Sequence, residues 1–287
     1  MGTSTAYGGP GGDTPLIPSW LGSDPGSEPD SGQDGDPSAD PDSLPAPPDK
    51  PSIPQAADPQ RFSVARNNFT RFAGSGGSDR ASLGRAVSGY VSTSSGGARQ
   101  ATQRMGASRG AGARLLGFLS DANARGMREA LKEFNLDSMA GRPISEVFVA
   151  LADHICPGAG TVDEGIAREA YIETIIDLAD QGLAALDTFS PEQMDTVFEL
   201  YATHAIEARI CNDIGTKVVT MPSNVQIAHQ VEKQLRDFIR GAVSDALTRA
   251  RESTPNVTQT QVLSFVDSVY ESAFSILKSL GDAEADQ

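Results

Sequence analysis

The sequence predicts an all-α protein, in which a helical, bundle-like C-terminal domain follows a long disordered N-terminal tail. From residue 116 onward, apolar residues recur at the spacing of a helix face, between residues that favour helix starts and stops. Only 217–221 has the composition of a strand, and five residues without a partner do not form a sheet. Residues 1–60 are rich in Gly and Pro, so they bury too little apolar surface to offset the entropy of ordering.

The net charge of −15 is unevenly distributed along the chain. Residues 1–60 hold ten acidic side chains against one lysine, whereas 61–115 hold nine arginines against one aspartate. The remainder is acidic again. We therefore divide the chain into a disordered tail (1–60), an arginine-rich neck (61–115) and a helical domain (116–287).

The neck predicts marginal helices. Residues 79–95 show helical spacing broken by Gly84 and Gly89, and 97–120 continue in the same style with further glycines. We expect both to lean on the helical domain through their C-terminal apolar ends. The glycine-rich run 74–78 lacks the Lys-Ser/Thr of a phosphate-binding loop and predicts a hinge.

The first helices of the helical domain are expected at 127–134 and 143–154, the second with Pro143 in its first turn. Thr161 and Glu164 have the spacing of a capping box, which predicts a helix from there to about Leu186.

Three longer helices follow. A second capping box at 190–193 begins a helix that should end at Gly215. Asn224 is placed to cap a run with one apolar stripe to about residue 247. The last helix should begin at Thr258 or Thr260 and end with Gly281 at its C-cap.

Few side chains are candidates for catalysis or metal binding. Their spacing fits none of the usual zinc patterns, and no nucleophile elbow or oxyanion loop accompanies them: His154, Cys156, His204, Cys211 and His229. We expect buried structural thiols and packed histidines. Four helical carboxylates are expected on solvated faces: Asp177, Asp180, Glu199 and Glu207. We assign no catalytic residue, no metal and no cofactor, and we expect a protein that is not an enzyme.

The first twenty-one residues resemble a recognition tag. They include the only tryptophan of the chain, in a segment that cannot form a core. Four of its apolar side chains gain stability only when another surface covers them: Leu16, Ile17, Trp20 and Leu21. The small Gly2 favours removal of Met1, which would leave a glycine amine at the N-terminus.

The chain shows no window of eighteen apolar residues and no signal-peptide pattern, so we expect a cytoplasmic protein without a membrane contact. Its pI near 4.5 argues against general nucleic-acid binding. The neck is the exception. Arg99, Arg104 and Arg109 could grip phosphates, and neighbouring aromatic residues could stack on bases: Phe62, Phe69, Phe72 and Tyr90. The other interpretation is that the arginines pair with the acidic parts of the chain or with an acidic partner.

The tag also carries a family resemblance. It is formed by Met1-Gly2-Thr3-Ser4, the glycine-rich run 8–12 and Thr14-Pro15-Leu16-Ile17-Pro18-Ser19-Trp20-Leu21. This opening resembles the start of QatB proteins of the bacterial Qat anti-phage system. The acidic linker, the Arg- and Phe-containing residues 61–72 and the helical remainder are similar in layout.

The resemblance implies a protein made beside an ATPase, a QueC-like enzyme and a TatD-like nuclease, and required with them for defence. QatB has no assigned catalytic motif. The QueC family activates a 7-deazaguanine carboxylate with ATP and normally forms its amide with ammonia.

These implications lead to a hypothesis in which a protein amine replaces the ammonia. The QueC-like partner would bind the tail and attach a deazaguanine-type group to the Gly2 amine. Thr3 and Ser4 would hydrogen-bond in its cleft, while the four apolar residues anchor on its surface. Two alternatives remain: the tail is only a docking peptide, or the protein presents phage DNA to the TatD-like nuclease through the neck.

Overall fold

The computed structural model describes residues 60–158, 160–180, 189–215 and 221–286. These residues belong to one unit, which begins at Ala56. They form ten α-helices, one π-helical turn and one 3₁₀ turn, and they contain no strand, which confirms the predicted all-α class. Three predictions fall outside the described residues: the disordered tail, the extension of a helix to Leu186 and the strand-like run 217–220.

The neck forms helices that belong to the core. They are α1 (Ser63–Gly74), α2 (Arg80–Gly89) with a π-helical turn η1 (Tyr90–Ser94), and α3 (Ala98–Gln103). Phe72, Leu83 and Tyr90 are buried as completely as any residue of the later helices. The neck therefore packs into the core along its whole length. Its burial is more extensive than expected, because the sequence predicted contact only through the C-terminal ends of its helices. Helix α4 (Gly106–Arg125) runs through residue 115.

The predicted hinge is an ordered turn between α1 and α2. The N–H of Gly77 donates to the carbonyl of Phe72 (3.1 Å), and both Gly76 and Gly77 have positive φ. Asp79 then caps α2 by accepting a hydrogen bond from the N–H of Ser82 (2.9 Å). The glycines serve here to reverse the chain tightly.

The middle of the chain forms α4, α5 (Met127–Lys132), a 3₁₀ turn η2 (Asp137–Met139), α6 (Ile144–Ile155) and α7 (Val162–Asp180). The capping box before α7 is present. Glu164 N–H donates to Thr161 Oγ1 (3.3 Å), and Thr161 N–H donates to Glu164 Oε2 (2.9 Å).

The three longest predicted helices are α8 (Pro191–Ile214), α9 (Val225–Ser253) and α10 (Val262–Ala285). Ser190 and Gln193 form the predicted capping box of α8, and Asn224 caps α9. Helix α8 is central, because it packs against α4, α7 and α9 and is buried along most of its length. None of the described helices is apolar over a length that would cross a bilayer.

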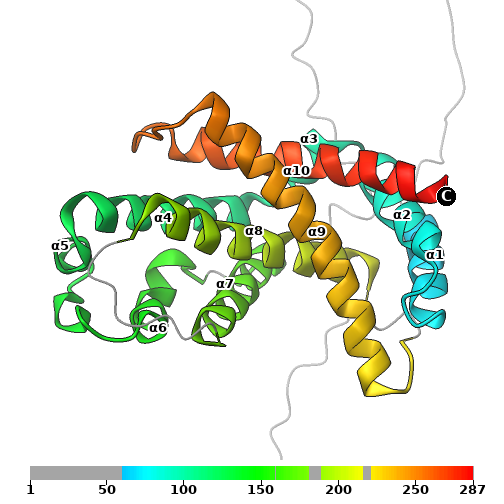
Figure 1. Ribbon diagram of the computed structural model, residues 1–287, viewed down its shortest axis with the longest axis horizontal. Coiled ribbons are helices and arrows are strands. Elements are labelled where there is room, and N and C mark those ends of the chain that lie inside the picture. The colour runs from blue at the N-terminus through cyan, green and yellow to red at the C-terminus, as the bar shows by residue number, and fades with distance from the viewer. Residues whose placement is uncertain (1–59, 159, 181–188, 216–220, 287) are drawn as a thin grey trace, which may run out of the picture. The chain divides into compact units, whose positions relative to one another are not determined.

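The prediction that Gly281 ends the last helix is wrong. Helix α10 continues to Ala285, and Gly281 is buried against Gly84 of α2. A Cβ atom on Gly84 would lie 2.5 Å from the carbonyl oxygen of Gly281, and one on Gly281 would lie 2.7 Å from that of Gly84. The two backbones are therefore in direct contact where α2 and α10 lie side by side (Figure 1).

Candidate functional site

A groove of about 840 Å³ is lined by α7, α8 and α9. Its charged lining is mainly acidic, with Lys233 and Arg236 as the basic members beside five carboxylates: Glu169, Glu173, Glu207, Glu232 and Asp237. The groove also brings together three of the residues that the sequence singled out, namely His204, Cys211 and His229.

His204 lies at the buried end of this groove and is 3 % exposed. Its Nε2 is 2.8 Å from Asp177 Oδ2, and its Nδ1 is 3.8 Å from Glu207 Oε2. Glu207 also accepts a hydrogen bond from Arg236 Nε (2.7 Å). Burial opposes protonation of the ring, but the interactions with the Glu207 and Asp177 carboxylates outweigh it, so the pKa of His204 lies above its usual value.

This geometry corrects part of the carboxylate prediction. Glu207 is buried and Asp177 holds His204, so neither is a simply solvated side chain. Glu199 accepts a hydrogen bond from Arg240 Nε (2.7 Å), while Asp180 is exposed as expected. The partners of Glu207 and Glu199 are Arg236 and Arg240 of α9, which lie about thirty and forty residues further along the chain and have no local sequence signal.

The two thiols are poor nucleophiles. Burial raises the pKa of Cys156 to about 11 and that of Cys211 to about 12, so both stay protonated near neutral pH. Cys211 shares the groove with His204, whereas Cys156 points at the carbonyl of Ala167 (3.5 Å). The His154 ring lies against that of Phe134 at a tilt of 55°, with 5.0 Å between the ring centres. In the described ranges no three His, Cys, Asp or Glu side chains are grouped to hold a metal ion.

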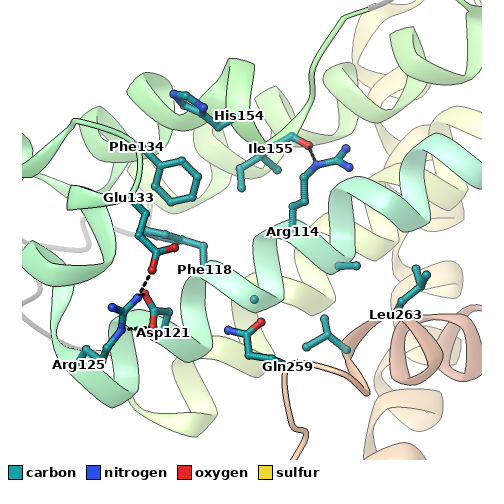
Figure 2. A pocket seen from close by; sticks show the side chains of 13 residues that line it. Arg114, Phe118, Asp121, Arg125, Glu133, Phe134, His154, Ile155, Gln259 and Leu263 are labelled. Carbon is teal, nitrogen blue, oxygen red and sulfur yellow. Dashed lines mark hydrogen bonds and ion pairs between the residues drawn. The ribbon is translucent and has the colours of Figure 1, made fainter.

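A second pocket, of about 370 Å³, lies between α4, the end of α6 and the start of α10 (Figure 2). Arg114 Nε donates to the carbonyl of Ile155 (2.8 Å), and Arg125 bridges Asp121 and Glu133. Its arginines and carboxylates thus have partners within the chain. The rest of its wall is mainly apolar, with Phe118, Phe134, Ile155, Val262 and the exposed Leu263 beside Gln259 and His154.

Most arginines of the neck have partners within the chain. Three donate to the carbonyl of the last residue of a helix: Arg66 to Ile214 of α8 (2.6 Å), Arg85 to Ala285 of α10 (3.2 Å) and Arg114 to Ile155 of α6 (2.8 Å). Carbonyls at a helix C-terminus lack intrahelical partners and attract cations. These arginines therefore act as C-terminal caps for helices distant in sequence.

Two further arginines form ion pairs with α10, Arg80 with Glu284 (3.1 Å) and Arg109 with Asp267 (2.5 Å). Of the three predicted phosphate contacts, Arg109 is thus engaged, Arg99 is exposed and Arg104 lies over Phe62. The predicted stacking platform is wrong, because the four aromatic residues are buried in the core: Phe62, Phe69, Phe72 and Tyr90.

The residues of the predicted tag lie outside the described part of the chain: Gly2, Thr3, Ser4, Leu16, Ile17, Trp20 and Leu21. The comparison with known families bears on the helical unit instead. A family model described as Qat anti-phage system associated protein QatB matches residues 96–277, which run from just before α3 into α10. The chain belongs to the QatB family.

The protein is accordingly a component of the Qat anti-phage system, which implies that it works with other Qat components. The family match lies in the helical unit, whereas the resemblance noted from the sequence was carried by residues 1–21. No curated protein and no solved structure matches this chain.

Proposed function

We propose that this QatB protein is a non-catalytic adaptor or protein substrate of the Qat system. Its N-terminal segment, beginning with Gly2 after removal of Met1, is bound by the QueC-like enzyme and conjugated to a 7-deazaguanine derivative. The helical unit serves as the body that other components of the system contact, including the ATPase and the TatD-like nuclease.

The observation that carries this proposal is the division of the chain. The helical unit begins at Ala56, so the tag is not part of it. Some forty residues rich in Pro and Asp separate Leu21 from α1, and linkers of that composition favour extended conformations with a long reach. Tethering at this length raises the local concentration of the tag near any enzyme docked on the body.

Gly2 is chemically suited to the reaction. An α-amino group has a pKa of about 7.7–8.0, whereas that of lysine is about 10.4, so a larger fraction of the glycine amine is neutral near pH 7. The neutral amine would attack the activated carboxylate of the deazaguanine. The new C–N bond would form as the activating group leaves, and the amine would give up a proton. Glycine has no Cβ atom to obstruct entry into a narrow active site.

The alternative, presentation of phage DNA to the TatD-like nuclease through Arg99, Arg104 and Arg109, has less support. Arg109 is paired with Asp267, and the neighbouring aromatic rings are buried. Both features reduce what this set could offer to a nucleic acid.

Mass spectrometry tests the proposal directly. The intact chain and its N-terminal peptide are compared after expression with and without the QueC-like enzyme. We expect a partner-dependent mass increase on Gly2 that the Gly2→Pro variant abolishes, together with phage protection, while a Gly12→Ala control keeps both. An unmodified glycine in cells that resist phage would exclude conjugation and leave the tail as a docking peptide.

A further inference from the structure

Three arginine side chains meet around one buried phenylalanine. The guanidinium carbons of Arg61, Arg104 and Arg66 lie 4.6, 5.8 and 5.9 Å from the ring centre of Phe62. They come from the turn before α1, the C-cap of α3 and α1 itself. Phe62 is 7 % exposed and stacks on Tyr90 (5.8 Å between ring centres), so packing holds the ring that the three guanidinium groups contact in place.

The positive charge of this cluster is not balanced by the described residues. Among them, no carboxylate forms an ion pair with Arg61 or Arg104. Arg66 donates to backbone carbonyls of Ile214 and Asp213. The Asp213 carboxylate is occupied by the Tyr90 hydroxyl (3.0 Å) and Arg209 Nε (3.2 Å). Like charges held this close repel one another, so an anion bound among them lowers the electrostatic energy.

The donors of the cluster suit an oxygen-rich anion. Ser94 Oγ already donates to the backbone carbonyl of Arg61 (2.7 Å) and Ser92 Oγ to that of Ser88 (2.6 Å), so the guanidinium groups are the donors that the cluster offers. Guanidinium groups are common donors to phosphate oxygens in proteins. Because Phe62 and Tyr90 are buried, the cluster offers no open ring on which a base could stack.

We propose that Arg61, Arg66 and Arg104 form a phosphate-binding site, occupied by the phosphate group of a nucleotide or of a nucleic-acid backbone. The site differs from the arginine set predicted from the sequence. It keeps Arg104, adds Arg61 and Arg66, and leaves out the exposed Arg99 and Arg109, which is ion-paired with Asp267. Arg66 donates to backbone carbonyls, which do not neutralise its charge. It is independent of the N-terminal conjugation, and either can fail without the other.

The test uses the full chain at low salt with two probes, inorganic pyrophosphate and a fluorescent oligo-dT. Titration is repeated with the double variant Arg61→Gln/Arg104→Gln and with the control Arg71→Gln/Arg99→Gln, which removes the same charge from exposed positions. We expect at least roughly tenfold weaker binding in the first variant and less than about twofold in the control. The probe that binds the unchanged protein more tightly identifies the source of the phosphate.

Three outcomes would overturn the site: no binding of either probe, equal weakening in both variants, or displacement of the probes by polyglutamate at matched charge. Circular dichroism melting checks that the variants fold. If the double variant melts early, Arg104→Gln against Arg99→Gln repeats the comparison with one charge each. Arg104 suits this purpose because its guanidinium group lies over the Phe62 ring and does not cap any of the described helices.

Discussion

The contact between α2 and α10 and the groove between α7, α8 and α9 are built in opposite ways. In the first, Gly84 and Gly281 bring two backbones together, and Arg85 caps the C-terminus of α10. In the second, charged side chains line the space between the helices, where His204 of α8 pairs with Asp177 of α7 and Glu207 of α8 pairs with Arg236 of α9. The first region therefore depends on the absence of side chains, and the second on the charge state of a few.

Substitution in the glycine contact should have the largest effect. Gly84→Ala places a methyl group within 3 Å of the α10 backbone, which cannot move aside as a side chain can, and should destabilise the fold by about 3 kcal/mol or more. Chemical denaturation measures the loss. Gly241→Ala is the matched control, because nothing lies within 4 Å of its Cβ position on α9, and it should gain about 0.5–1 kcal/mol. Equal behaviour of the two variants would show that the backbones are not in contact.

The stability that the groove contributes should depend on pH instead. The folded-state pKa of His204 lies above its usual value of about 6.5, so its protonated ring stabilises the fold fully below that pH. The contribution is lost as the pH rises through the raised pKa. His204→Asn should therefore cost about 2 kcal/mol at pH 6 and clearly less at pH 9. Urea denaturation at both pH values measures this, with the exposed His229→Asn as control. A cost that does not change with pH would mean that folding does not shift the pKa of His204.

The arginine caps should show the smallest of the three effects. Arg66→Ala removes the donors to the end of α8 and should lower stability by about 1–2 kcal/mol. Arg71, on the same helix but exposed, should change it by less than about 0.5 kcal/mol when replaced by alanine. A shift in thermal midpoint of the same size for both variants would mean that loss of positive charge, and not loss of the cap, lowers the stability.

The helix starts were predictable because capping is local. Ser190 with Gln193 and Asn224 with its own helix act within four residues, and such pairs are visible in the sequence. Gly281 was misinterpreted for the same reason. A glycine near a helix end has the same local pattern whether it terminates the helix or meets another backbone, and its partner Gly84 lies almost two hundred residues earlier.

The candidate sites were predictable only in part. His204 and Cys211 stood out as rare residue types, but the ion pairs of Glu207 with Arg236 and of Arg109 with Asp267 join distant helices. The excess of arginine in the neck was plain. Its distribution over helix ends, ion pairs and the cluster around Phe62 depends on the three-dimensional packing and has no local sequence signal.

The pairing of α2 with α10 also sets an order of events on the ribosome. Gly84 emerges long before Gly281, and at about 5–20 residues per second the interval is roughly 10–40 s. During this time α2 is made but lacks the helix that covers it. Gly2 is translated before either, so the conjugation proposed above does not have to wait until the helical unit is complete.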